Sequence, residues 1–142
     1  MQTVSTPDLE LMQVSLGSDP EYQRVNVAFP ISRETGAEHT AIVYFEIAPG
    51  ERLASHTDSA EEILYIVSGE AEAEIGDERG RVRAGDLAVI PAMVPHGLIN
   101  TGDEPVKVVG FFCEAVVTST FEGPLQPLGV AQPVIGGAAV AA

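Results

Sequence analysis

Basic residues and cysteine are scarce in this chain. Its 142 residues include only seven Lys and Arg against 21 Asp and Glu, so the formal net charge is −14. Nucleic-acid backbones and anionic membrane surfaces bind clustered basic side chains, and we therefore expect neither as a partner. The single cysteine, Cys113, cannot form a disulfide within the chain, which excludes the disulfide framework of many small secreted domains.

Long apolar segments are also missing. No run approaches the about 18 apolar residues that indicate a membrane-spanning helix. Residues 1–17 lack the basic start and the apolar stretch of a signal peptide. We therefore expect a cytoplasmic protein. A chain of this length can bury one sizeable core, so we expect a single domain.

Turn residues are frequent and divide the middle of the chain into short segments. There are 14 Gly and 10 Pro, and only 20% of the residues are charged. Turn signals about 8–12 residues apart, with no helical period between them, predict an antiparallel β-sandwich or barrel. The predicted strands are residues 40–48, 62–68, 70–75, 79–82, 87–90, 96–100 and 106–112.

The two ends of the chain differ from this middle zone. Residues 1–20 end in a cluster of turn residues, and we expect an N-terminal arm or edge strand there. Residues 21–122 carry the predicted domain. Residues 123–142 have no charge and no amphipathic period. They predict a tail that is either draped over the surface or disordered, with cover of a neighbouring subunit as the alternative.

Two of the three histidines lie where they can form a site. His56 follows the turn at residues 49–50, and His96 follows two prolines. Residues two apart on a strand share a side, so His56 and Asp58 face one cavity if their segment is extended. An irregular corner after Asp58 could bring Glu62 to the same cavity. Two imidazoles with one or two carboxylates would form a site for a divalent metal, whereas singly each residue is more often a structural histidine or a surface acid.

The spacing of these residues resembles the cupin superfamily, whose motifs are G(X)5HXH(X)3–4E(X)6G and G(X)5PXG(X)2H(X)3N. The chain matches the first motif over residues 50–69 and the second over residues 85–100, with all spacings kept. The matched positions are Gly50, His56, Glu62, Gly69, Gly85, Pro91, His96 and Asn100. The resemblance covers residues 40–112 and implies an all-β fold, the double-stranded β-helix or jelly-roll barrel that encloses a pocket. It also implies a homodimer that exchanges or shares edge strands.

Two positions depart from the cupin pattern. Asp58 stands where the first motif has its second histidine, and Met93 stands where the second motif has its inner glycine. The resemblance implies metal ligation by His56, Glu62 and His96. Asp58 is then either a fourth ligand or a residue that orients a bound water. We expect Met93 to change a tight turn, and its side chain could narrow the cavity.

This donor set predicts a metal-dependent enzyme that acts on a small oxygenated molecule. Fe(II) or Mn(II) is favoured, with Zn(II) or Ni(II) as alternatives. A dioxygenase-type reaction is our first expectation; a non-redox isomerase, cyclase, lyase or decarboxylase is the second, and a binding or sensing barrel without turnover is the third. Tyr44 and Glu46 share one face of the predicted strand 40–48 and are candidate acid–base groups if that face points inward. The alternative is that both face solvent or a dimer partner.

Overall fold

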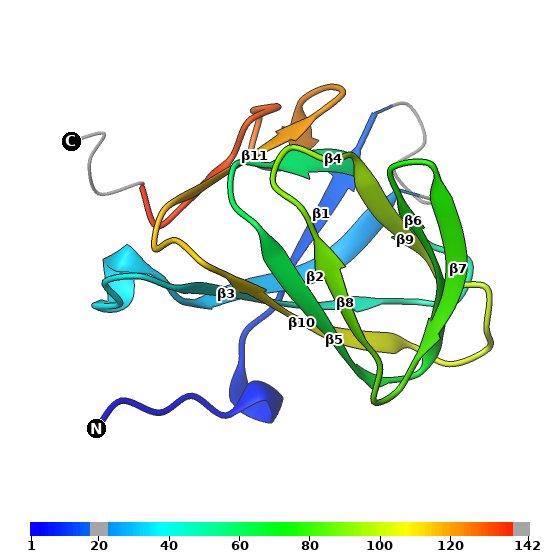
Figure 1. Ribbon diagram of the computed structural model, residues 1–142, viewed down its shortest axis with the longest axis horizontal. Helices are drawn as coiled ribbons and strands as arrows, with labels where there is room; N and C mark the ends of the chain where they lie inside the picture. Colours follow the sequence, from blue (N-terminus) through cyan, green and yellow to red (C-terminus); the bar gives the residue numbers. More distant parts are fainter. Residues whose placement is uncertain (18–22, 138–142) are drawn as a thin grey trace.

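The structure, a computed structural model, describes residues 1–17 and 23–137 and consists of two antiparallel sheets that form a barrel (Figure 1). The strands are β1 (Met12–Leu16), β2 (Arg24–Ile31), β3 (Ala41–Ile47), β4 (Arg52–Asp58), β5 (Glu62–Ser68), β6 (Glu70–Ile75), β7 (Glu78–Arg83), β8 (Leu87–Ile90), β9 (His96–Ile99), β10 (Val106–Phe112), β11 (Val117–Phe121), β12 (Leu125–Gln126) and β13 (Val134–Ile135). The seven-stranded sheet has the order β12-β1-β2-β3-β10-β5-β8, and the six-stranded sheet has the order β13-β11-β4-β9-β6-β7. The predicted all-β barrel is confirmed.

Helix is limited to two 3-10 turns, η1 (Thr6–Asp8) and η2 (Arg33–Thr35). Within the described ranges, no helix is long and apolar enough to cross a membrane.

All seven predicted strands are present. The predictions for residues 62–68, 70–75, 87–90 and 106–112 coincide with β5, β6, β8 and β10, whereas those for β3 and β7 differ by one residue at each end and that for β9 by one residue at its C-terminal end. Strands β2 and β4 were not predicted. In β4 the inward positions include His56 and Asp58, so the apolar alternation that marks a half-buried strand is broken there. In β2, Val25 and Val27 alternate with polar neighbours, and this pattern could have predicted the strand.

The core fills the space between the two sheets. Successive side chains of a strand point to opposite faces, and on β3 this buries Val43, Phe45 and Ile47 inside the barrel. Val108 of the neighbouring strand β10 and Leu98 of β9, in the other sheet, belong to the same core. The opposite, outer face of β3 carries Tyr44 and Glu46, and this alternation decides which side chains can reach the cavity.

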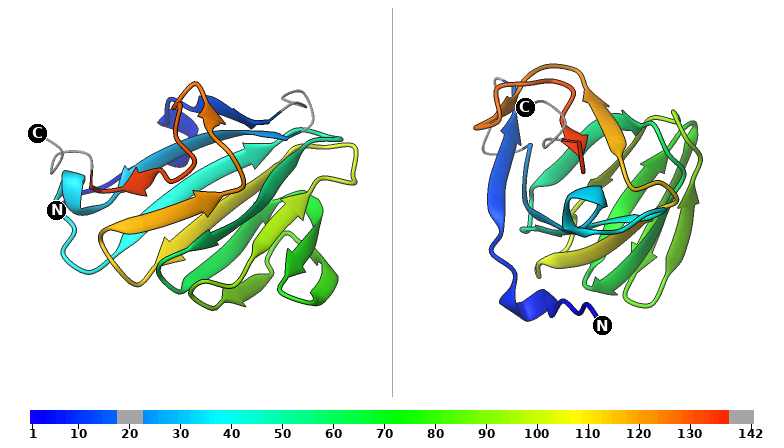
Figure 2. Two further views of the ribbon diagram at one scale, coloured as in Figure 1. Left: turned by 90° about the horizontal axis from the view of Figure 1, so that it is seen from above. Right: turned by 90° about the vertical axis from the view of Figure 1, so that its left-hand side faces the viewer.

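Strands near both ends of the described chain pair with strands of the barrel. Strand β1 pairs with β2 and with β12, and β13 pairs with β11. The segment that contains β12 and β13, orange to red in Figure 2, lies against β1 and β11. Leu125 and Ile135 of this segment are buried and belong to the core. Residues 18–20 of the predicted arm and 138–142 of the predicted tail lie outside the described residues.

Candidate metal centre

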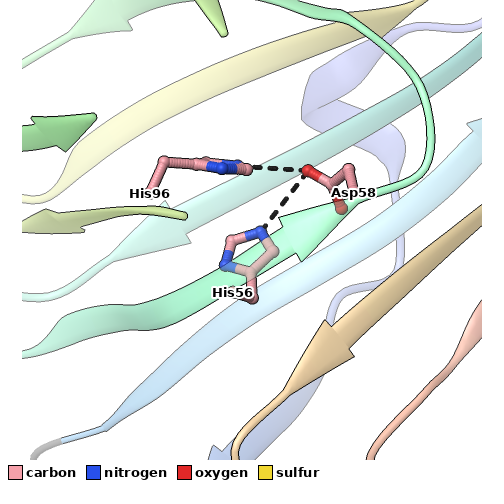
Figure 3. A group of neighbouring side chains, drawn as sticks. All are labelled: His56, Asp58 and His96. Carbon is pink, nitrogen blue, oxygen red and sulfur yellow. Dashed lines mark ion pairs between the residues drawn. The ribbon is translucent and has the colours of Figure 1, made fainter. Parts of the chain in front are cut away.

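Four candidate ligands come together because of the register of three strands. His56 and Asp58 lie two residues apart on β4 and therefore point to the same side. The pairing of β4 with β9 places His56 opposite His96, and the two ring centroids are 4.3 Å apart. Asp58 Oδ2 lies 3.1 Å from His96 Nε2 and 3.6 Å from His56 Nε2. Figure 3 shows these three side chains pointing toward one another.

Glu62 approaches the same point from the first position of β5. Its Oε1 lies 3.5 Å from His96 Nε2, and the side chain is buried. Gly110 on the neighbouring strand β10 leaves the space that this carboxylate occupies, because a Cβ atom at Gly110 would overlap Glu62. The corner between β4 and β5 thus brings Glu62 to His96, but Glu62 is not part of the group formed by His56, Asp58 and His96, whose ligand atoms all lie within 4.8 Å of one another.

The backbone orients both imidazoles. His56 Nδ1 lies 2.8 Å from the carbonyl oxygen of Ala54, and His96 Nδ1 lies 2.9 Å from that of Val94. A carbonyl can only accept, so each Nδ1 carries a hydrogen, and in the neutral imidazole Nε2 presents its lone pair to the shared point. This is the tautomer in which a neutral histidine binds a metal through Nε2.

Ser119 of β11 fixes the orientation of Asp58. The two residues are paired in the β11–β4 register, and Ser119 Oγ donates a hydrogen bond of 2.6 Å to Asp58 Oδ1. This leaves Oδ2 directed at the two imidazoles. Ser119 was not singled out from the sequence, because its partner lies 61 residues away in the chain. The sequence feature that could have pointed to Ser119 is a hydroxyl at an inward-facing position of a segment rich in β-branched residues.

The four groups lie at one end of an apolar cavity of about 80 Å³. The polar lining residues are His56, Asp58, Glu62, His96 and Ser119, and every other lining residue is apolar. Phe121 stacks on the ring of His56, with the centroids 4.5 Å apart and the planes 12° from parallel. Leu125, Leu128, Pro133 and Ile135 of the C-terminal segment complete the wall. The uncharged tail therefore forms part of the candidate site, which the sequence did not predict.

Comparison with known proteins identifies the family. The profile of the Cupin domain family matches residues 43–112. The chain belongs to the cupin superfamily. Among solved structures, this cupin is similar to a predicted oxalate decarboxylase from Thermotoga maritima, with a TM-score of 0.68, 19% identity, and coverage of 80% of this chain and 99% of that one. It is also similar to the polyketide cyclase RemF from Streptomyces resistomycificus, with a TM-score of 0.65, 20% identity, and coverage of 80% of each chain.

Curated relatives match over shorter stretches. Protein SchB of Streptomyces halstedii is 34% identical over 64 residues, which is 44% of this cupin and 46% of SchB. The 3-hydroxyanthranilate 3,4-dioxygenase of Bacillus thuringiensis (strain Al Hakam) is 38% identical over 53 residues, which is 34% of this chain and 30% of the relative. The match thus spans less than half the length of either relative.

Burial and mutual contact shift the pKa values of the four groups. Burial, followed by the charge of His96, lowers the pKa of His56 to about 4. Burial also acts to lower the pKa of His96, but its contacts with Asp58 and Glu62 outweigh this and raise the pKa to about 10. Burial raises the pKa of the Glu62 carboxyl. For Asp58 burial acts in the same direction, yet His96, His56 and Ser119 together hold its pKa below the usual range.

The residues of this cupin fit a divalent cation. Potential ligand atoms of His56, Asp58 and His96 all lie within 4.8 Å of one another. Asp58 Oδ2 and His96 Nε2 are buried and lie 3.1 Å apart, with His56 Nε2 3.6 Å from the former and Glu62 Oε1 3.5 Å from the latter. Buried charged groups are costly unless they are paired or coordinate a metal, and a cation at this point would be held by both carboxylates and imidazoles. Imidazole and carboxylate are also the donors that divalent first-row metals accept.

Three other positions singled out in the sequence lie away from the cavity. Tyr44 and Glu46 are on the outer face of β3, where the Tyr44 hydroxyl donates a hydrogen bond of 2.6 Å to Glu46 Oε2. Neither residue lines the cavity, which Val43 and Phe45 reach from the same strand. Met93 has a φ of 65°, the conformation for which the motif has glycine, but its side chain is 61% exposed and does not narrow the cavity.

Proposed function

We propose that this cupin is an enzyme that depends on one divalent cation bound by His56, Asp58, Glu62 and His96. The observation that carries the proposal is the convergence of buried potential ligand atoms on one point: Asp58 Oδ2 lies 3.1 Å from His96 Nε2 and 3.6 Å from His56 Nε2. The cluster lies at the end of a cavity, so a cation held there would face the space in which a small molecule can bind. Fe(II) or Mn(II) suits the two carboxylates, and Zn(II) or Ni(II) is the alternative.

The reaction that the geometry supports best is non-redox: an isomerisation, cyclisation, lyase reaction or decarboxylation of a molecule with a carbonyl or enol oxygen. When bound, the cation would supply Lewis-acid stabilisation of negative charge on that oxygen. The position of Asp58 favours this chemistry. With four protein donors, fewer coordination positions remain for both dioxygen and a chelating substrate. The oxalate decarboxylase and cyclase names of the structural neighbours agree with this class, although those likenesses concern the fold.

The chain contributes orientation and exclusion of water. The carbonyl oxygens of Ala54 and Val94 hold the two imidazoles in the metal-binding tautomer, and Ser119 holds Asp58. The apolar walls keep water away from the reacting atoms. In such an environment each electrostatic interaction with the substrate is stronger than in water.

A dioxygenase is the second candidate. His56, Glu62 and His96 without Asp58 would form the two-histidine, one-carboxylate set found in non-haem Fe(II) oxygenases. The partial match to 3-hydroxyanthranilate 3,4-dioxygenase favours this reading. The two candidates differ in whether Asp58 is a ligand and in whether turnover consumes oxygen.

Metal reconstitution tests the proposal. Protein freed of metal by chelation is loaded separately with Mn(II), Fe(II), Zn(II) and Ni(II), and bound metal per chain is measured after gel filtration. We expect one metal per chain, with loss of metal in Glu62→Ala and retention in the matched control Glu61→Ala, whose side chain is exposed. Failure of the parent protein to retain any of the four metals would contradict the proposal.

Turnover under argon and in air then separates the two reactions. Screening is done with carbonyl-containing and phenolic compounds on the metal-loaded protein. Product formation without oxygen supports the non-redox enzyme. Product formation only in air, with oxygen consumed in proportion to the product formed, supports the dioxygenase and contradicts the non-redox reaction.

A further inference from the structure

We propose that the substrate of this site is an uncharged aromatic molecule that carries its reacting oxygen at one end. The inference rests on the proposed function, because it takes the cavity beside the candidate metal centre as the place of reaction. It goes further by assigning a chemical class to the molecule that binds there. Three features of the described residues support it: the charge of the site, the composition of the walls and the nature of the entrance.

The first feature is the absence of a basic side chain from the cavity wall. All seven basic residues of the chain lie in the described part, and none of them lines the cavity. Four of them take part in ion pairs elsewhere or lie on an outer face: Arg24 pairs with Glu51, Arg79 and Arg81 pair with glutamates of β6, and Lys107 is exposed on β10. A substrate carboxylate would therefore find no lysine or arginine in the cavity wall.

The charge of the ligand set points the same way. Two carboxylates, Asp58 and Glu62, neutralise a divalent cation, so the loaded centre would have no net charge left to balance an anion. Burying a carboxylate in an apolar cavity without a counter-charge costs several kcal/mol or more. Small dicarboxylates and aromatic acids are therefore disfavoured, whereas a neutral phenol or ketone meets no such cost.

The second feature is the aromatic wall. Phe29, Phe45, Phe112 and Phe121 line the cavity, and these are four of the five phenylalanines in the chain. Aromatic side chains pack favourably against the faces and edges of aromatic ligands. All the polar lining groups lie in the cluster around His96, so a ligand is expected to have one polar end and an apolar body.

The third feature is the entrance, which we place at the C-terminal segment because Leu128 both lines the cavity and is 38% exposed. Leu125, Leu128, Pro133 and Ile135 form the part of the wall that comes from this segment, and residues 123–137 contain no charged side chain. A ligand that passes these four side chains meets apolar groups there. The open volume of about 80 Å³ is smaller than the about 300 Å³ of a usual ligand pocket, so a ring compound must also displace part of this segment.

A pair of probes tests the charge preference directly. 1-Naphthol and 1-naphthoate share one ring system and differ in a neutral hydroxyl against a carboxylate at pH 7. Binding is measured by isothermal titration calorimetry with metal-free and with Zn(II)-loaded protein. We expect 1-naphthol to bind both forms of the protein. Its dissociation constants should be at least about tenfold lower than that of 1-naphthoate for the metal-free form. Equal or tighter binding of 1-naphthoate to the metal-free form, or no binding of 1-naphthol to either form, would overturn the proposal.

A variant with a cation in the wall provides the complementary test. Leu128 lines the cavity and is 38% exposed, so it can accept a longer side chain. Leu128→Arg should shift the preference toward 1-naphthoate, whereas Leu128→Gln should not. Val130→Arg, at an exposed position outside the lining, adds the same charge and should leave the preference unchanged. If Leu128→Arg binds 1-naphthoate no better than the two controls, the charge argument is wrong.

Metal content, measured on the same samples, separates this proposal from the proposed function. If the protein retains one metal per chain but does not prefer 1-naphthol, the substrate assignment is wrong and the proposed metal-dependent function stands. If the protein retains no metal but prefers 1-naphthol, the ligand class stands and the metal-dependent function is wrong.

Discussion

At the scale of single residues, the candidate centre depends on side chains that hold other side chains. Asp58 can direct Oδ2 at the two imidazoles because Ser119 binds its other oxygen. Such outer hydrogen bonds commonly change metal affinity by about 10–100-fold. The hydroxyl of Ser119 is therefore expected to affect metal affinity through Asp58.

Replacing Ser119 should weaken metal binding. Ser119→Ala removes the hydrogen bond to Asp58 Oδ1, and we expect metal affinity to fall about tenfold or more, measured by competition with a chelator. Ser119→Thr keeps the hydroxyl and should restore most of the affinity. Ser55→Ala, at an exposed position of β4, is the matched control. Parent-like affinity in Ser119→Ala would show that Asp58 needs no such support.

Metal uptake should depend on pH through His96. In the metal-free protein the pKa of His96 is raised to about 10, so at neutral pH this imidazole carries a proton that a cation must displace. His56, with a pKa of about 4, is already unprotonated. Apparent affinity should therefore rise with pH, by about tenfold per pH unit for one displaced proton. Competition titrations between pH 6 and 8 measure this, and an affinity that is constant over that range would contradict it.

The four candidate ligands could be identified from the sequence, but their supporting residues could not. His56, Glu62 and His96 keep the motif spacing, and Asp58 follows from its place two residues after His56. Ser119 depends on the pairing of two strands far apart in the chain. The direction of Tyr44 and Glu46 depends on which face of β3 is inside, and alternation alone leaves that choice open.

At the scale of elements, the centre exists because neighbouring strands leave room for one another. Strand β10 lies between β3 and β5, and its Gly110 provides the space for the Glu62 carboxylate from β5. Strands with apolar alternation and clear turns were predictable. Strand β4 was not, because polar ligands occupy its inner face, and β12 and β13 are only two residues long.

Substitution of Gly110 should displace Glu62. In Gly110→Ala the new methyl group would overlap the Glu62 carboxylate and the Val43 side chain. We expect a loss of metal affinity and a decrease of about 1–3 kcal/mol in the free energy of unfolding, measured by chelator competition and by urea denaturation. Gly80→Ala on β7 is the control, since nothing lies within 4 Å of its added carbon. Equal behaviour of the two variants would contradict the crowding argument.

At the scale of the whole molecule, one outer face is unusually apolar. Alternate residues of β5, β8 and β10 expose large apolar side chains there: Ile63, Tyr65, Val67, Leu87, Val89 and Phe111. The chain before β1 extends below the barrel in Figure 1 and in the right-hand view of Figure 2, and it exposes Met1 and Val4. An apolar face with an adjacent arm suits a second copy of the chain, because a twofold axis would pair each face with itself and each arm with the partner.

We therefore predict a homodimer through this face. Leu87→Asp places a charge at a position that is 69% exposed on the end strand β8, and it should convert dimer to monomer in sedimentation velocity. Val130→Asp, exposed at another part of the surface, should remain dimeric. A parent protein that is monomeric at tens of micromolar would contradict the prediction.

The C-terminal segment gives this barrel a way to change its selectivity while keeping its chemistry. The metal-binding candidates lie on β4, β5 and β9, whereas part of the cavity wall comes from a stretch that two short ladders and a few further backbone hydrogen bonds attach. Substitutions, insertions or fusions near a chain end are tolerated better than changes in central strands. Relatives could thus diverge in what they accept by altering this stretch alone. For the same reason, a purification tag placed at the C-terminus should disturb ligand preference before it disturbs metal content.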